Sequence, residues 1–213
     1  MKIIFLLVLA VSAFAQDYPY VCTWSAFESC YPLIDKTKTY CFVGDSYTYR
    51  YSFQTGFPGM IVYNYAIGSQ TISDCIRDQL PLVLALGPDI VFVMIGVNDL
   101  HANGAILTGM KESYSDLVAI MMNAGIKVYP LTVIPVPDSW RSTMINALIY
   151  SWNHWIIETF ENVIDVGLYY SPFIGGGSAS YQYYVSDGHL NRAGYYFYIK
   201  ALFDNVEEFG ITR

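Results

Sequence analysis

Short apolar runs alternate with longer stretches of helical periodicity along the chain from Thr39 onward. Each run is rich in β-branched and aromatic residues and ends in a turn, which is the pattern of a strand that leads into a helix. Because most runs are continuously apolar, we expect strands that are buried on both faces, as in a parallel sheet. The predicted strands are Tyr40–Val43, Ile61–Tyr65, Ile90–Ile95, Lys127–Val133 and Val163–Val166.

The stretches between the strands carry apolar residues at the spacing of an amphipathic helix. Gly87 and Gly125 are typical of helix ends. The alternation indicates an α/β fold in which helices cover a five-stranded parallel sheet on both faces. Ligands bind such sheets beyond the carboxyl ends of the strands, so candidate chemistry is expected in the turns that follow them. The predicted helices lie at about Thr71–Leu86, Met110–Asn123, Ser139–Glu161 and Asn191–Phe209.

The chain begins with the features of an export signal. Lys2 precedes an apolar run from Ile3 to Val11, and Ala13–Ala15 has the small-x-small pattern of a cleavage site. The run is too short to span a bilayer, and no later segment is long and charge-free enough to do so. We therefore expect a secreted or lumenal protein without stable membrane insertion. Its expected parts are a signal peptide at residues 1–15, an N-terminal extension at 16–38 and one domain at 39–213.

Charge and cysteine content narrow the possible partners. Without Lys2, ten of the eleven Lys and Arg residues remain against eighteen Asp and Glu, which gives a net charge of about −8. No basic cluster occurs, so nucleic acid is not an expected partner. All four cysteines lie between residues 22 and 75, and after an export signal they favour disulfides over metal ligation. Of three possible pairings we favour Cys22 with Cys30 and Cys41 with Cys75, with buried thiols as the alternative.

The first and third predicted strands each deliver polar residues at their carboxyl ends. Gly44–Ser46 follows the first strand, where a serine on a sharp turn would face a cleft, although a helix N-cap has the same local pattern. Gly96–Asp99 follows the third strand, and the two turns are expected to be neighbours. There the Asn98 amide could donate to a developing oxyanion, or it could simply bond to local backbone. Asp45 is expected to brace the loops.

A third turn and a C-terminal loop add to this arrangement. Backbone N–H groups of Asn64–Thr71, after the second strand, can point at the same cleft, with a plain strand-to-helix connection as the alternative. Asp187 and His189 share one loop before the last helix. A serine becomes a good nucleophile when an imidazole accepts its proton and a carboxylate fixes the tautomer of that imidazole. The other histidines, His101 and His154, are expected in a loop and on a helix without a catalytic role.

In chain order, these four segments resemble the sequence blocks of the SGNH hydrolase family of GDSL-like lipases and esterases. The resemblance spans nearly the whole chain from Thr39 onward and is nearest to small platelet-activating-factor acetylhydrolase-like esterases. It implies a flavodoxin-like three-layer fold and hydrolysis of esters or thioesters, with no cofactor or metal. The resemblance also implies Ser46 as nucleophile, His189 as general base and Asp187 as the acid that orients it. The N–H group of Ser46 and the amide of Asn98 would then hold the oxyanion.

Two positions depart from the family pattern. The second block usually supplies a glycine N–H to the oxyanion, and the corresponding position here is Ser69, with Gly68 one place earlier. Because the donor is a backbone N–H, serine can serve if the turn does not demand a positive φ, so we assign the role to Ser69 first and Gly68 second. The acid usually lies three residues before the histidine, where this chain has Ser186. Asp187 lies two before it, and a backbone carbonyl near Ser186 is the alternative acceptor.

The substrate is the least determined part of the prediction. We expect Tyr47 and Trp140 to line the cleft, together with Tyr49 and Tyr181–Tyr184, unless these aromatics simply belong to the core and the surface. The expected substrate carries a short acyl or acetyl group on a lipid or a carbohydrate, by analogy with the family. The chain has no Gly-x-Ser-x-Gly elbow, which argues against an α/β-hydrolase. The alternatives are a non-catalytic carbohydrate- or lipid-binding module and an acyltransferase, and a monomer is expected.

Overall fold

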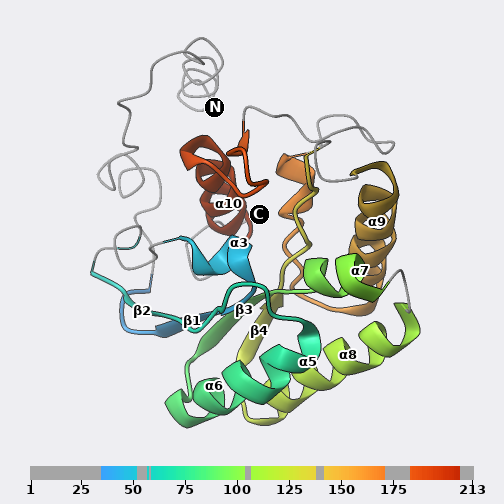
Figure 1. The fold of residues 1–213 in the computed structure, drawn as a ribbon. Coiled ribbons are helices and arrows are strands. Elements are labelled where there is room, and N and C mark those ends of the chain that lie inside the picture. The colour runs from blue at the N-terminus through green and yellow to red at the C-terminus, as the bar shows by residue number, and fades with distance from the viewer. Residues whose placement is uncertain are drawn as a thin grey trace.

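The structure is a computed structural model of the 213-residue chain and describes residues 35–51, 57, 59–103, 107–137, 142–170 and 183–206. The predicted signal peptide and most of the predicted N-terminal extension lie outside these residues. In the described part, four parallel strands form one sheet in the order β2-β1-β3-β4 (Figure 1). The strands are β1 (Thr39–Gly44), β2 (Ile61–Asn64), β3 (Ile90–Met94) and β4 (Lys127–Pro130).

Helices cover both faces of the sheet, which confirms the predicted fold class. The helical elements are α3 (Ser46–Tyr49), α5 (Ile72–Asp74), η1 (Cys75–Gln79), α6 (Leu80–Leu86), α7 (Val97–Asn103), α8 (Leu107–Asn123), α9 (Ser142–Thr159), η3 (Gly167–Tyr169) and α10 (Arg192–Asn205). Figure 1 shows α6 and α8 on one side of the sheet and α3 and α10 on the other. Within the described residues, no helix is both long and apolar enough to cross a membrane.

The four predicted helices are present over the described residues, with shifted ends. Helix α8 begins three residues earlier than predicted, and α10 ends at Asn205 because Val206 takes an extended conformation. The predicted start of α9 at Ser139 and the predicted end of α10 at Phe209 lie outside the described residues. The short helices α3 and α7 were not predicted, because both begin inside the turns that follow β1 and β3.

The predicted helix at Thr71–Leu86 contains a wider turn. Its middle, η1, is a π-helical turn in which the Leu80 N–H donates to the Cys75 carbonyl. Pro81 follows immediately. In an ideal α-helix the ring of Pro81 would clash with the carbonyl of Arg77, and a wider turn just before the proline relieves this clash. The helix therefore continues through a proline that would otherwise break it.

The fifth predicted strand, Val163–Val166, is reduced to a single parallel bridge between Ile164 and Leu131. Directly after this bridge, hydrogen bonds to side chains take the place of strand pairing. Asp165 accepts a hydrogen bond from the Thr132 hydroxyl at 2.8 Å, and that hydroxyl accepts from the Gly167 N–H, where η3 begins. Pairing with β4 therefore stops after one residue, and the sheet of the described residues has four strands.

The disulfide predicted between Cys41 and Cys75 is absent. Both residues are free thiols with no exposed surface, Cys41 within β1 and Cys75 at the start of η1. Burial raises the pKa of each thiol to about 12. They therefore act as small apolar core residues, the alternative that the sequence left open. The predicted pair of Cys22 and Cys30 lies outside the described residues.

Candidate active site

Ser46 is presented by a sharp turn at the carboxyl end of β1. The strand ends at Gly44, where a Cβ atom would lie 2.1 Å from the Met94 carbonyl oxygen, so a larger residue would force β1 and β3 apart. Asp45 then caps α3, because its Oδ1 accepts from the Tyr47 N–H at 3.0 Å. Ser46 becomes the first residue of α3 at the strand edge where ligands bind in α/β sheets.

A hydrogen-bonded series links Ser46 to the C-terminal loop. Ser46 Oγ lies 2.8 Å from His189 Nε2, and His189 Nδ1 lies 3.0 Å from Asp187 Oδ1. The same Asp187 oxygen accepts from the His189 backbone N–H at 3.1 Å. Gly188 between them has a φ of +78°, which folds the loop so that an acid two residues before the histidine reaches its ring. The imidazole is 14% exposed, whereas the Asp187 side chain is 51% exposed.

Arg50 anchors Asp187 from the end of α3, the helix that begins with Ser46. It ends α3, one turn after Ser46, and its Nη1 donates to Asp187 Oδ2 at 2.7 Å. Together with the N–H groups of His189, this guanidinium holds the pKa of the Asp187 carboxyl well below its usual range. The sequence did not suggest Arg50, because α3 was not predicted and the two residues lie 137 positions apart.

The loop that carries His189 is braced by buried tyrosines. The Tyr47 hydroxyl donates to the Gly188 carbonyl at 3.1 Å, and the Tyr184 hydroxyl donates to the Pro135 carbonyl at 2.5 Å. Tyr47, which we expected to line the cleft, is only 3% exposed, so it supports the loop from below. Tyr184 is buried as well, and Tyr183 is partly buried. Trp140, Tyr181 and residue 182 lie outside the described residues.

The remaining candidates fall on exposed helix positions. Tyr49 is 59% exposed and follows Ser46 on α3. His101 lies on α7 instead of in a loop, and although its side chain is exposed, partial desolvation of its ring lowers its pKa. His154 pairs with Glu158 at 3.0 Å on the surface of α9, where a non-catalytic residue was expected.

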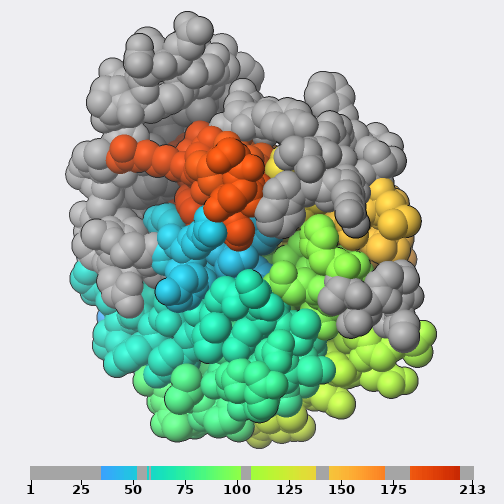
Figure 2. Space-filling model, in the orientation of Figure 1, coloured from blue at the N-terminus to red at the C-terminus, as the bar shows by residue number. Residues whose placement is uncertain are grey.

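The second turn lies beside Ser46, and the third turn contacts the second. A Cβ atom on Gly68 would lie 3.9 Å from the Ser46 Cβ, which places this turn against α3. Figure 2 shows the blue surface around α3 between the red surface of α10 and the teal segment that follows β2. Asn98 in the third turn donates one amide hydrogen to the Gln70 carbonyl at 2.9 Å. A carboxamide carries two such hydrogens, so this bond orients the group and leaves a second donor.

Ser69 has a left-handed backbone conformation with a φ of +64°, so the turn does demand a positive φ. This conformation costs an L-amino acid about 1–2 kcal/mol, whereas glycine adopts it freely. The demand explains why a glycine is usual at this position in the family that the sequence resembles. Serine accepts the strain and keeps the backbone N–H.

Replacing Ser69 with glycine is therefore expected to raise the free energy of unfolding by about 1 kcal/mol, because relief of strain outweighs the greater freedom of the unfolded chain. Urea denaturation of the two proteins measures the difference. Ser69→Ala serves as the control, since alanine keeps the Cβ atom and should give no gain. A Ser69→Gly variant no more stable than wild type would contradict this account.

Two buried carboxyl groups lie behind the turns. Burial raises the pKa of Asp45 to about 7, with a further contribution from the charge of Asp99. Burial also raises the pKa of Asp99 to about 6, although its carboxylate accepts from the Ile72 N–H at 3.1 Å. As expected, Asp45 braces the turn from within. In the described part of the chain, no three His, Cys, Asp or Glu side chains form a group that could hold a metal ion.

Comparisons with known proteins give the family of the chain and further examples of its fold. The model of the GDSL-like Lipase/Acylhydrolase family matches residues 42–197. No curated protein matches the chain significantly. A GDSL-like lipase from Bacteroides thetaiotaomicron shares the fold with a TM-score of 0.68 at 18% identity, over 87% of this chain and 96% of that one.

Two other solved structures are similar. An acetyl xylan esterase variant from Geobacillus stearothermophilus has a TM-score of 0.63 at 19% identity, over 84% of this chain and 99% of that one. A Streptococcus pneumoniae protein provisionally named as a platelet activating factor has a TM-score of 0.61 at 21% identity, over 78% of this chain and 83% of that one. At these identities the likeness shows the fold, whereas the family match covers most of the sequence. The chain belongs to the GDSL-like lipase/acylhydrolase family and is a carboxylic ester hydrolase.

Proposed function

We propose that this protein is a secreted serine esterase that removes short acyl groups, above all acetyl, from a carbohydrate or lipid. The observation that carries the proposal is the hydrogen-bonded series from Asp187 through His189 to Ser46, with distances of 3.0 and 2.8 Å. A serine hydroxyl needs such an imidazole to remove its proton during attack on an ester.

In the first half of the reaction, His189 takes the proton of the Ser46 hydroxyl while Oγ bonds to the ester carbonyl carbon. The carbonyl oxygen becomes an oxyanion, held by the N–H groups of Ser46 and Ser69 and by the free N–H of the Asn98 amide. Collapse of the tetrahedral intermediate breaks the bond to the alcohol, which leaves with the proton from His189. In the second half, His189 deprotonates a water molecule that attacks the acyl-enzyme, and the acid and Ser46 are released.

The exposure of Asp187 and Arg50 to solvent supports water as the acyl acceptor. The side chains of Asp187 and Arg50 are 51% and 43% exposed, so solvent reaches the edge of the site. An acyltransferase must keep water away from its acyl-enzyme, which favours a closed site. The open edge therefore favours hydrolysis over transfer to another hydroxyl.

Three observations support an acetyl group on a carbohydrate as the substrate. Structures with a similar fold include acetyl xylan esterases, whose name denotes an acetylated sugar polymer as substrate. Tyr49 offers an exposed ring three residues after Ser46, a surface on which a sugar ring could pack. The net charge of −7 disfavours anionic lipid surfaces. Secretion is proposed from the apolar N-terminal sequence alone.

The test is hydrolysis of p-nitrophenyl acetate, butyrate and octanoate, and of acetylated xylan, by the purified protein. We expect kcat/KM for the acetate to exceed that for the octanoate at least about 10-fold. In a pocket shaped for a short acyl group, each additional methylene of a longer chain changes transition-state binding by about 1–3 kcal/mol. A diethyl phosphoryl inhibitor should label Ser46, as seen by mass spectrometry of the peptide that contains it.

Three results would contradict the proposal. An absence of both hydrolysis and labelling would favour a binding module on the same fold. A preference for octanoate would replace the short-acyl substrate with a lipid. Product analysis with an added alcohol would identify an acyltransferase, if the ester of that alcohol forms faster than the free acid.

A further inference from the structure

Two buried glutamines connect the turns of the active site, and the mechanism above assigns them no role. Gln79, the last residue of η1, has no exposed surface, and Gln70, which follows Ser69, is 8% exposed. Gln79 Nε2 donates to Gln70 Oε1 at 2.6 Å. A buried amide costs free energy unless its polar atoms are bonded, so the bonds that these two side chains make define their role.

Gln79 binds the backbone of Gly44, the last residue of β1. Its Oε1 accepts from the Gly44 N–H at 2.9 Å, and its Nε2 donates to the Gly44 carbonyl at 2.8 Å. That carbonyl also accepts from the Ile67 N–H at 3.1 Å, which ties it to the second turn. Gly44 lies two residues before Ser46. One side chain therefore fixes both polar groups of the glycine from which the nucleophile turn departs.

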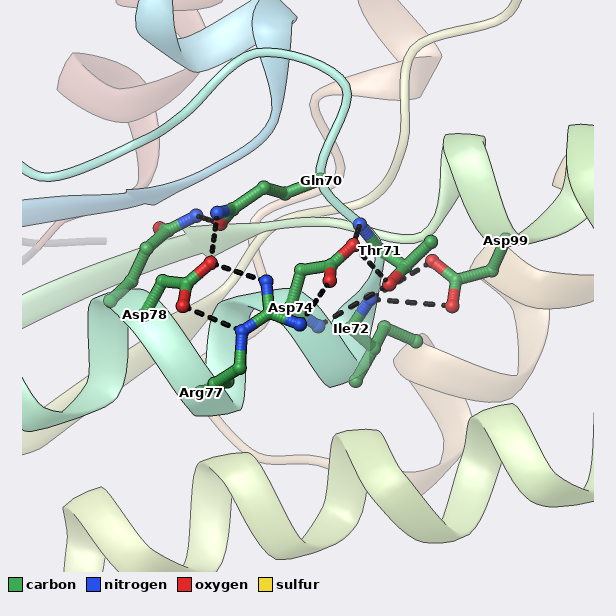
Figure 3. Close-up of polar contacts among 8 residues, drawn as sticks. Gln70, Thr71, Ile72, Asp74, Arg77, Asp78 and Asp99 are labelled. Carbon is green, nitrogen blue, oxygen red and sulfur yellow. Dashed lines mark hydrogen bonds and ion pairs between the residues drawn. The ribbon is translucent and has the colours of Figure 1, made fainter.

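Gln70 extends this connection to the other two turns. Its backbone carbonyl accepts the Asn98 amide, and its side-chain Nε2 donates to Asp78 Oδ2 at 2.7 Å. Figure 3 shows Gln70 pointing toward Asp78, and Arg77 lying between Asp78 and Asp74. The Gln70 side chain is thus held at its oxygen by Gln79 and at its nitrogen by Asp78.

We propose that Gln79 and Gln70 are positioning residues that hold the Ser46 turn, the Ser69 turn and the Asn98 amide in the geometry required by the oxyanion. The inference rests on the proposed esterase function. A misplacement of about 1 Å costs about 10²-fold in rate, similar to the loss of one oxyanion donor. Both side chains are buried and lack access to substrate, so their loss lowers kcat and leaves KM nearly unchanged.

The test compares kcat and KM for p-nitrophenyl acetate between wild type, Gln79→Met and Gln70→Met. Methionine has a similar length and makes none of the hydrogen bonds. We expect kcat to fall about 10²-fold for Gln79→Met. For Gln70→Met we expect a fall of about 10-fold, because Gln79 and its two bonds to Gly44 are still present in that variant. In both variants KM should change less than about 3-fold.

Asn146→Leu is the matched control. Asn146 is 6% exposed, and its side chain bonds to both the N–H and the carbonyl of Val136 at 2.9 Å, as Gln79 does to Gly44. This variant loses the same kind of backbone contact and should keep kcat within about 3-fold of wild type. An equal loss of kcat in Asn146→Leu, or a retained kcat in Gln79→Met, would overturn the proposal. If Gln79→Met does not fold, an unchanged kcat in Gln70→Met overturns it.

Amide hydrogen exchange separates this inference from the esterase function. We expect faster exchange of the Gly44 and Ile67 N–H groups in Gln79→Met than in wild type or in Asn146→Leu, because local opening becomes easier. If wild type hydrolyses no ester, the proposed function fails while the exchange still reports on positioning. Unchanged exchange at both groups, in both glutamine variants, would show that the pair does not order these turns.

Discussion

Replacement of Ser46 by alanine is expected to lower kcat/KM for p-nitrophenyl acetate by at least about 10⁴-fold, because removal of a serine nucleophile costs up to about 10⁶-fold in other serine hydrolases. Without Oγ no acyl-enzyme forms, and the oxyanion donors alone accelerate attack by water only weakly. The free energy of unfolding should change by less than about 1 kcal/mol, since Ser46 is partly exposed and contributes little to the core.

Ser151→Ala is the control for this experiment. Ser151 is exposed on α9, and its hydroxyl donates to the Ala147 carbonyl at 3.1 Å within the same helix. Its removal should leave kcat/KM within about 2-fold of wild type. A Ser46→Ala protein that keeps more than a tenth of the activity would show that another group performs the reaction.

Replacement of Asp187 by asparagine is expected to lower kcat about 10³-fold, because an amide fixes the wrong tautomer of the imidazole and cannot stabilise the imidazolium. Asp187 Oδ1 accepts from both the ring and the backbone N–H of His189, while Oδ2 accepts from Arg50. An asparagine side chain has only one accepting oxygen, so it cannot serve His189 and Arg50 in the same way. KM should change far less than kcat. Steady-state kinetics at several substrate concentrations separates the two constants.

Asp116→Asn, at an exposed position on α8, is the matched control and should have no effect on kcat. The pH dependence gives a second check. Arg50 and His189 hold the pKa of Asp187 well below its usual range, so its carboxylate stays ionised from neutral pH to below the pKa that an aspartate has in the unfolded chain. A fall in wild-type activity between about pH 7 and 5 therefore does not come from protonation of Asp187. Full activity of Asp187→Asn would assign the orienting role to a backbone carbonyl.

The fold was predictable where the sequence pattern and the packing agree. The apolar runs of β1 and β3 are buried over almost their whole length, so their composition alone indicates central strands. The segment Val163–Val166 is apolar except for Asp165, and it pairs through Ile164 only, because Asp165 and Thr132 bond side chain to side chain. Here a side-chain hydrogen bond takes the place of further backbone pairing between strands. Which of the two forms depends on tertiary contacts, and these cannot be inferred from the spacing of apolar residues.

The site residues that could be predicted are those that lie in short sequence motifs. Ser46, Asn98 and His189 each lie in a short turn sequence that follows a strand or precedes a helix. Arg50 and Gln79 could not be found this way, because their partners lie 137 and 35 residues distant. Tyr47 was placed at the cleft surface for the same reason, since its contact with Gly188 exists only in the folded chain.

Ser46 and His189 lie 143 residues apart in the sequence, and one hydrogen bond of 2.8 Å joins them. A contact between such distant positions forms late in folding, because the intervening chain must first be ordered. During synthesis, the strands that present Ser46 emerge long before the loop of His189 and the final helix. A nascent chain, or one truncated before His189, therefore holds Ser46 without the base that we propose for it.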